Sequence, residues 1–395
     1  MSIPVQPLLA AVDAPPIWEA QGWIAGRTFP AQKPLIDVCQ AVPGYPPPDT
    51  LLDHLAAALK RPETHRYTEF GGLARLRSSL AADINRSYGG AVTREDVFVT
   101  AGCNQAFCLT ASALAKTGDE IILPLPAYFN YSMWLGMTGV GVRHVAFRPE
   151  TNGLPDLADI RNAITPRTRA LVLISPNNPT GAIYPPDYLG HAFELCRGAG
   201  IALVVDETYR DFLTDGGVPH ALFQRPNWQG TLIHLYSFSK VFCLTGYRTG
   251  AIVADPKFLA QIGKEMDCVA ICPPHIGQIA AAYGLEALGE WRRTNSELMR
   301  GRLEAMRRAF SRGDIGYEIV SAGAYFAYLK HPHAGRRSLA VARRLAERQN
   351  LLALPGSIFG PDQEDYVRMA FANVDATLMD DIAARLGSDA ADQVW

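Results

Sequence analysis

Several signatures that define other protein classes are missing from this sequence of 395 residues. No Cys-x-x-Cys pair occurs and the seven cysteines make an odd number, so neither a disulfide framework nor a zinc site is predicted. We therefore expect reduced thiols, no bound metal and a cytoplasmic location. The net charge is only −2, which removes the electrostatic case for nucleic acid or an anionic membrane as partner.

Other missing sequence features exclude further classes of protein. No apolar run approaches the roughly 18 residues of a membrane span. The apolar run near the N-terminus has no basic region before it and is broken by Asp13, so no signal peptide is expected. The Gly-x-Gly-x-x-Gly fingerprint is also missing, which argues against a nicotinamide-binding Rossmann protein. What remains, with 48% hydrophobic and 19% charged residues, is typical of a globular protein with a sizeable core.

Short apolar runs with little internal alternation recur between residues 97 and 255, and helical patterns separate them. Continuous apolar runs are typical of strands buried on both faces, as in a parallel sheet covered by helices. The alternation of strands and helices predicts an α/β domain. The predicted strands cover residues 97–100, 120–125, 142–147, 170–175, 201–206, 231–237 and 250–255, and two of the predicted helices cover 104–116 and 185–200.

The C-terminal third has a different pattern. A helical stretch over 275–310 precedes strands near 317–320 and 324–329, a helix near 338–349 and a strand over 366–372. This order predicts a smaller α+β domain. The proline-rich segment 43–50 is typical of a linker. We therefore expect a large domain over 46–285 and a small domain that combines 1–45 with 286–395.

Polar residues follow the predicted strands. In open α/β sheets ligands bind outside the carboxyl ends of the strands, so these residues should converge on one site. Asp206 is the most informative, because a carboxylate that ends an apolar strand is costly without a cationic partner. A glycine turn at Gly102 opens a helix, and a helix N-terminus favours anions.

The segments after three of these strands are PNNPTG at 176–181, DETYRDF at 206–212 and SFSKVFCLTGYRTG at 237–250. Together they resemble the fold-type I pyridoxal-phosphate enzymes, in particular the class I and II aminotransferase family. Further matches occur in the family's order, so the likeness runs from residue 44 to residue 372. They are YTEFGGLARLR (67–77), TAGCNQAF (100–107), PAYFNY (126–131) and YVRMAFA (366–372).

The resemblance implies pyridoxal 5'-phosphate as cofactor and a catalytic set of Lys240, Asp206 and Tyr209. Lys240 is similar to the lysine that forms the Schiff base and then moves a proton as general base and acid. Asp206 is similar to the aspartate that keeps the pyridine nitrogen protonated. Tyr209 and Asn178 are similar to the two donors to the ring's 3-oxygen, and Tyr128 is similar to the aromatic residue that stacks on the ring.

The resemblance also implies a site for the cofactor phosphate. A dianionic phosphate needs several hydrogen-bond donors and a fixed positive charge, which an arginine supplies. The residues that resemble this site are Ser237, Ser239 and Arg248, together with the backbone of Gly102, Cys103 and Asn104.

Three more residues are carried over from the family. Arg368 is similar to the arginine that holds the substrate α-carboxylate, with Asn178 beside it, and Gly44 is similar to a glycine whose backbone contacts the same carboxylate. Tyr67 is similar to a tyrosine that reaches the phosphate of the partner subunit's cofactor. The resemblance therefore implies a homodimer with shared active sites.

The function implied is an amino-acid aminotransferase that passes an amino group to a 2-oxo acid in two half-reactions. The same scaffold hosts other chemistries, so a lyase that eliminates a sulfur substituent or forms a cyclopropane stays open as an alternative. A non-catalytic regulator is disfavoured, because no DNA-binding domain fits before residue 44. Asn104 stands where acidic-substrate relatives carry a lysine, so we expect neutral or aromatic donors to react at least as well as aspartate.

Overall fold

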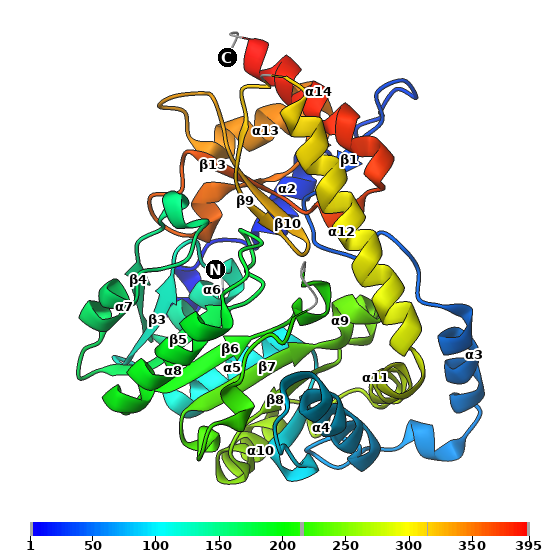
Figure 1. The fold of residues 1–395 in the computed structure, drawn as a ribbon, viewed down its shortest axis with the longest axis vertical. Helices are drawn as coiled ribbons and strands as arrows, with labels where there is room; N and C mark the ends of the chain where they lie inside the picture. Colours follow the sequence, from blue (N-terminus) through cyan, green and yellow to red (C-terminus); the bar gives the residue numbers. More distant parts are fainter. Residues whose placement is uncertain (1–2, 214–216, 314, 393–395) are drawn as a thin grey trace.

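The structure is a computed structural model that describes residues 3–213, 217–313 and 315–392. One half of the molecule contains a seven-stranded sheet in the order β2-β8-β7-β6-β5-β3-β4 (Figure 1). Neighbouring strands run parallel, except that β8 is antiparallel to β2 and β7. The strands are β2 Val97–Thr100, β3 Glu120–Pro124, β4 Gly141–Val145, β5 Thr168–Ile174, β6 Ala202–Asp206, β7 Leu232–Ser237 and β8 Gly250–Val253.

Both faces of this sheet are buried under helices. Successive side chains on a strand point to opposite faces, and Val172 and Val204 belong to one buried cluster while Leu173 and Val205 belong to the other. This burial explains the continuous apolar runs and confirms the predicted α/β class. One cluster includes α3 Asp49–Ala58, α4 Ala74–Tyr88, α7 Leu157–Ala163, α8 Pro186–Ala199 and α11 His275–Ala287, and the other includes α5 Cys103–Leu114, α6 Phe129–Thr138 and α10 Pro256–Ala270.

The other half is built around a four-stranded antiparallel sheet in the order β12-β13-β10-β9. The chain's N-terminal segment joins this half, because β1 Ile36–Asp37 pairs in parallel with β11 Leu351–Leu352. The remaining strands are β9 Glu318–Gly323, β10 Phe326–Lys330, β12 Leu354–Pro355 and β13 Tyr366–Met369, and the helices packed on them are α12 Gly289–Ser311, α13 Ser338–Gln349 and α14 Met379–Ala391.

The long helical stretch predicted over 275–310 is two helices. Leu288 has φ −105° and ψ 28° and ends α11, and α12 begins at Gly289. A glycine weakens a helix locally, and the two helices bury their apolar faces in different cores, Ile279 in that of the large sheet and Leu303 in that of the small one. In Figure 1, α12 runs from beside the large sheet to the far end of the molecule.

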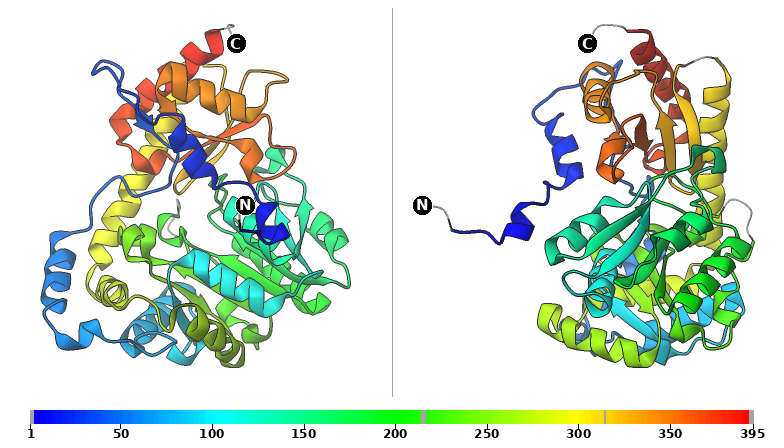
Figure 2. Two further views of the ribbon diagram at one scale, coloured as in Figure 1. Left: turned by 180° about the vertical axis from the view of Figure 1, so that it is seen from behind. Right: turned by 90° about the vertical axis from the view of Figure 1, so that its left-hand side faces the viewer.

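Two short helices, α1 Pro7–Ala10 and α2 Pro16–Gly22, precede β1. The segment before α2 projects from the body of the molecule (Figure 2). Ile17 on α2 packs on a cluster that also contains Phe129 of α6 and Leu354 of β12, so α2 lies where the two halves meet. Within the described ranges, no helix is both long and apolar enough to cross a lipid bilayer.

Candidate active site

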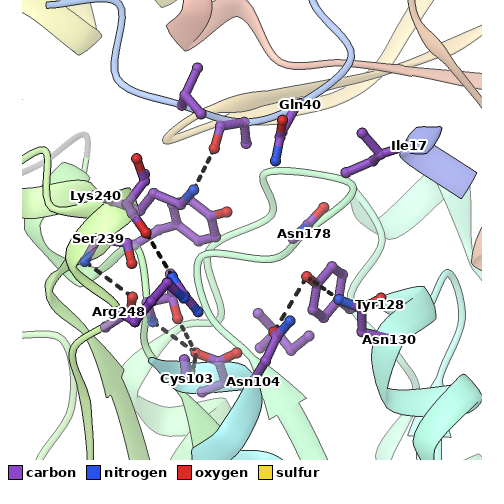
Figure 3. Close-up of a pocket in the computed structure, with 18 of the residues that line it drawn as sticks. Ile17, Gln40, Cys103, Asn104, Tyr128, Asn130, Asn178, Ser239, Lys240 and Arg248 are labelled. Atoms are coloured by element: carbon purple, nitrogen blue, oxygen red, sulfur yellow. Dashed lines mark hydrogen bonds between the residues drawn. The ribbon is translucent and has the colours of Figure 1, made fainter. Parts of the chain in front are cut away.

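A cavity of about 540 Å³ lies at the carboxyl ends of β5, β6 and β7, below the segment that leads from β1 (Figure 3). This is where the polar residues after the strands were predicted to converge. The lining residues are Ile17, Gln40, Ala41, Val42, Cys103, Asn104, Tyr128, Asn130, Ile174, Asn178, Asp206, Thr208, Tyr209, Ser237, Ser239, Lys240, Thr245, Gly246 and Arg248.

Asp206 ends β6 and is 5% exposed. Its Oδ1 accepts hydrogen bonds from the Thr208 amide at 2.9 Å and hydroxyl at 2.7 Å, and from the Cys103 thiol at 3.5 Å. Its Oδ2 accepts one from the Tyr131 hydroxyl at 2.6 Å. All of these donors are neutral, and no cation forms an ion pair with Asp206 in the part of the chain that the structure describes. The carboxylate is oriented, but its charge is not neutralised.

Lys240 lies on the short helix α9 Phe238–Val241, directly after β7. Its Nζ donates a hydrogen bond to the carbonyl oxygen of Ala41 across the cavity. Burial lowers the pKa of Lys240 to about 8, and the nearby charges of Arg368 and Arg248 contribute to this lowering. The amine can therefore be neutral close to physiological pH, which a nucleophile or a proton acceptor requires.

The N-terminus of α5 and Arg248 meet at one end of the cavity. Gly102 precedes α5 with φ 85° and ψ 167°, a conformation that favours glycine, and a Cβ atom there would lie 2.3 Å from Arg248 Nη2. Arg248 Nη1 donates to the carbonyl of Thr245 at 2.9 Å, and among the described residues no carboxylate pairs with Arg248. Ser237 and Ser239 line the same cavity. These donors form a cationic cradle without a counter-ion from the described part of the chain.

Three further predicted residues, Tyr128, Asn178 and Tyr209, form walls of the cavity. The Tyr128 hydroxyl accepts a hydrogen bond from Asn130 Nδ2 at 2.9 Å and donates one to Asn104 Oδ1 at 3.4 Å. Burial raises the pKa values of Tyr128, to about 12, and of Tyr209, so both hydroxyls stay protonated and can donate hydrogen bonds.

Arg368 of β13 lies directly behind Asn178 and is 2% exposed. Its Nη1 donates to Asn178 Oδ1 at 3.2 Å and its Nη2 to the carbonyl of Cys39, whereas its buried Nε has no hydrogen-bond partner among the described residues. No carboxylate forms an ion pair with it in the described ranges. Burial lowers the pKa of Arg368. A buried guanidinium that lacks a carboxylate partner in the described ranges can bind an anion supplied by a ligand.

Comparison with known proteins agrees with this geometry. The family described as aminotransferase class I and II matches residues 29–386. The chain belongs to the class I and II aminotransferase family. An aspartate/prephenate aminotransferase of Thermus thermophilus is 30% identical to it, over 87% of this chain and 88% of that protein. An aromatic aminotransferase of Arabidopsis thaliana is 28% identical, over 95% and 93% of the two chains.

A solved structure of the aspartate aminotransferase of Thermus thermophilus with maleate is also similar. It superimposes with a TM-score of 0.89 at 25% identity, over 98% of this chain and all of that one. These likenesses confirm the predicted fold class and the predicted activity. The chain is an aminotransferase, and the enzymes of its family act on amino acids and 2-oxo acids and depend on pyridoxal phosphate.

The structure does not bring Gly44 into the aminotransferase cavity. The Gly44 amide donates to the carbonyl of Ala372 at 3.1 Å, and a Cβ at Gly44 would lie 2.7 Å from the Asn373 carbonyl oxygen. The lack of a side chain at Gly44 allows its backbone to pack closely on that of residues 372 and 373. Ala41, three residues earlier, is the residue of this segment whose carbonyl bonds Lys240. Gln40 also lines the cavity.

Tyr67 also lies outside the cavity of its own chain. It is 76% exposed, in the segment before α4. Phe70 is 55% exposed nearby.

Tyr131 and Ile17 were expected only as apolar walls of the substrate site, whereas Gln40 and Ala41 were not predicted at all. Tyr131 does not line the cavity, and its polar role was missed: its hydroxyl donates to Asp206 Oδ2 across 75 positions of sequence. The signal was present in PAYFNY, where Tyr131 follows Tyr128 by almost one helical turn and so faces the same side of α6. Gln40 and Ala41 gave no local signal. These two residues follow β1, which is held in place by pairing with a strand more than 300 residues away.

Proposed function

We propose that this cavity binds pyridoxal 5'-phosphate and that amino transfer takes place there. The observation that carries the proposal is the set of charges without partners. Asp206 is an anion without a cation and Arg248 a cation without an anion within the described ranges, and Lys240 lies in the same cavity. The cofactor has complementary groups, a ring nitrogen that can be protonated and a dianionic phosphate. When bound, its ring withdraws electrons from the substrate Cα.

The residues that would hold the phosphate are those of the cationic cradle. Arg248 supplies the fixed charge, the hydroxyls of Ser237 and Ser239 supply neutral donors, and the backbone amides at the start of α5 supply the rest. These amides belong to Gly102, Cys103 and Asn104. The required glycine at 102 supports this assignment, because it keeps the space beside the guanidinium free of a side chain.

The ring would be held by the residues above the strand ends. Asp206 would pair with the ring nitrogen and keep it protonated. Tyr209 and Asn178 would donate hydrogen bonds to the 3-oxygen, and Tyr128 would lie against the ring face. Support comes from the placement of these side chains in the cavity and from the raised pKa of Tyr209, which keeps its hydroxyl a donor.

Lys240 and Arg368 would act on the amino acid. Lys240 would anchor the cofactor, then take the proton from the substrate Cα and return one at the end of each half-reaction. Its lowered pKa supports this role. Arg368, together with Asn178, would bind the α-carboxylate, since its buried guanidinium lacks an anion in the described ranges. The backbone contribution expected from Gly44 would come instead from residues 40–42, which line the cavity.

We further propose the division into a large domain over 46–285 and a small domain from 1–45 and 286–395. The separate apolar cores of the two sheets support it, as does the pairing of β1 with β11. The cavity then lies between the domains, with Lys240 from the large one bonded to Ala41 from the small one.

A homodimer with shared active sites is proposed from Tyr67. Its exposed ring, Phe70 and two exposed apolar residues at the end of α10, Val269 and Ile271, belong to neighbouring segments, because the Thr68 amide donates to the Cys272 sulfur at 3.4 Å. Exposed apolar clusters mark interfaces. Tyr67 would reach the cofactor phosphate of the partner chain. Mixing inactive Lys240→Ala chains with inactive Tyr67→Ala chains should restore activity in hybrid dimers, whereas an active species that sediments as a monomer contradicts the proposal.

The central test is whether the cofactor can be attached covalently to Lys240. Borohydride reduction of the yellow holoenzyme should fix the cofactor to the peptide that contains Lys240. The same preparation should form keto acids from amino donors only when 2-oxoglutarate or pyruvate is added. Label on another lysine would refute the assignment of Lys240. Release of pyruvate and ammonia without an acceptor would indicate the lyase reaction instead.

A further inference from the structure

One wall of the cavity carries polar side-chain groups to which the proposed function has so far given no role. It is formed by Asn104, Tyr128 and Asn130, which we call the amide wall, and Figure 3 shows Ile17 and Gln40 on the other side of the space in front of it. All five side chains are uncharged. They come from the start of α5, the start of α6, α2 and the segment after β1.

The amide wall contains a chain of two hydrogen bonds that leads from Asn130 through Tyr128 to Asn104. Asn130 Nδ2 donates to the Tyr128 hydroxyl at 2.9 Å, and that hydroxyl lies 3.4 Å from Asn104 Oδ1, to which it donates. This leaves the amide N–H groups of Asn104 and the amide oxygen of Asn130 without a partner among the described residues. Asn104 is exposed, and the amide oxygen of the half-buried Asn130 is not among the fully buried atoms without a partner, so both groups are accessible to a ligand. The wall therefore offers donors on one side of the hydroxyl and an acceptor on the other.

The charged groups of the cavity determine which kind of substrate side chain can bind at the amide wall. The cations that line the cavity in the described ranges are Lys240 and Arg248, and both are engaged by the proposed cofactor site. An acidic side chain would lose its hydration at the wall without gaining a counter-charge, and it would also meet the acceptor oxygen of Asn130. An aliphatic side chain would cover the free amide groups without bonding them.

A carboxamide satisfies both free groups at once, because its oxygen accepts and its nitrogen donates. We infer that the preferred amino donor carries a side-chain carboxamide, as asparagine and glutamine do, and that the amide wall recognises it. This inference rests on the proposed function, because it assigns the substrate side chain of the same site. Sites built to hydrogen-bond a substrate group reject analogues that lack it more strongly than apolar pockets do.

The test uses three donors of nearly equal size: asparagine, aspartate and leucine. With one acceptor, kcat/KM for asparagine should exceed that for aspartate and that for leucine by at least tenfold. Asn104→Leu should reduce the advantage over leucine to less than threefold. Asn104→Lys should reverse the order of asparagine and aspartate, because it adds a cation at the wall. The matched control is Asn162→Leu on the exposed side of α7, which should leave all three ratios unchanged.

Binding can be measured without turnover. α-Methyl-asparagine and α-methyl-aspartate have no α-proton, and their binding to the holoenzyme changes the visible absorbance of the cofactor. The asparagine analogue should bind at least tenfold more tightly, and Asn104→Leu should abolish the difference. The inference is overturned if the aspartate analogue binds as tightly as the asparagine analogue or more tightly, or if kcat/KM for aspartate or leucine equals that for asparagine. In either case a yellow, active enzyme still supports the proposed function. A protein without visible absorbance and without turnover of any amino acid overturns both.

Discussion

Asp206 and Glu207 are neighbours in the chain, yet they face opposite surroundings. Asp206 faces the cavity, and the described residues that bond it there are all neutral. Glu207 faces the core, where its Oε2 accepts from the Tyr88 hydroxyl at 2.5 Å, His234 Nε2 at 2.9 Å and His220 Nε2 at 3.2 Å. Burial raises the pKa of Glu207, but the two histidines outweigh this effect and hold that pKa well below its usual range.

The same contrast separates the arginines. Arg210 is buried in the core and pairs with Asp83, as does Arg292, whose Nη1 lies 2.8 Å from Asp83 Oδ1. Burial raises the pKa of Asp83, yet the two guanidinium groups lower it to about 2. Arg368 is equally buried and has no carboxylate partner in the described ranges. Charges that the chain pairs internally support the fold, whereas buried charges that it leaves unpaired mark where a ligand supplies the partner.

The largest effect should come from Lys240→Ala, which removes both the cofactor anchor and the proton shuttle. We expect kcat to fall by about 10⁴-fold or more. The melting temperature of the apoenzyme should not fall, because the substitution removes a single hydrogen bond, to Ala41, together with a buried ammonium group that is costly to desolvate. Lys257→Ala, at an exposed site on α10, is the control and should keep full activity. A Lys240→Ala enzyme within tenfold of wild type would contradict the role.

Asp206→Asn and Glu207→Gln test the first comparison directly. Asp206→Asn keeps the shape but removes the charge, so kcat should fall by about 10²- to 10³-fold with little change in melting temperature. Glu207→Gln breaks a buried charged cluster and should cost about 3 kcal/mol of stability while the purified enzyme retains most of its kcat. Equal losses of activity and of stability in the two variants would remove the distinction between them.

The second comparison is tested by Arg368→Gln and Arg210→Gln. Arg368→Gln should lower kcat/KM for every amino donor alike by about 2 kcal/mol or more, roughly 30-fold, because all donors share the α-carboxylate. Arg210→Gln leaves part of the Asp83 charge uncompensated and should lower the melting temperature instead. If Arg368→Gln spared some donors, its partner would be a side chain of the substrate and not the common carboxylate.

The residues on the cavity side of this contrast could be identified from the sequence. Asp206 was recognisable because a carboxylate ends an apolar strand, and β6 ends at Asp206. The strand at 97–100 has the predicted bounds, since its side chains alternate between two buried faces and each of its positions is buried. Lys240 and Arg248 were found from one continuous segment, whose turn geometry is local.

What depends on distant packing was not predictable. Glu207 and Asp206 look alike in DETYRDF, and only the fold shows that His220 and His234 surround one of them. The position of Gly44 outside the cavity was not predictable either, because a glycine signals a close approach without showing what approaches; here it is the backbone of residues 372 and 373. Gln40 reaches the cavity because the preceding strand, β1, pairs with β11 near the other end of the chain.

A smaller effect concerns pH. The pKa of Lys240 is lowered to about 8 by burial and then by Arg368 and Arg248. Below that pH the amine is protonated and has no free electron pair, so the rate of cofactor incorporation into apoenzyme should rise with pH and be half-maximal near pH 8. Arg368→Gln removes a neighbouring positive charge and should move this midpoint upward, toward the ordinary value of 10.5. Rapid-mixing absorbance measurements would show it, and an unshifted midpoint would mean that Arg368 does not contribute to the lowered pKa.

The smallest effect should come from Tyr131→Phe, which removes one of the neutral hydrogen bonds that orient Asp206. The ring stays in place because it stacks on Phe107 with centroids 3.6 Å apart. One such bond contributes about 1 kcal/mol, so kcat should fall by about fivefold and the pH dependence of the cofactor absorbance should shift. Tyr188→Phe is the matched control, because its hydroxyl donates to the Pro155 carbonyl at 2.8 Å away from the cavity. It should change the melting temperature by a similar amount but leave kcat and the absorbance profile unchanged. If both variants behave alike, the hydrogen bond from Tyr131 contributes to the stability of the fold and not to catalysis, and Tyr131 then belongs with the core residues of this comparison.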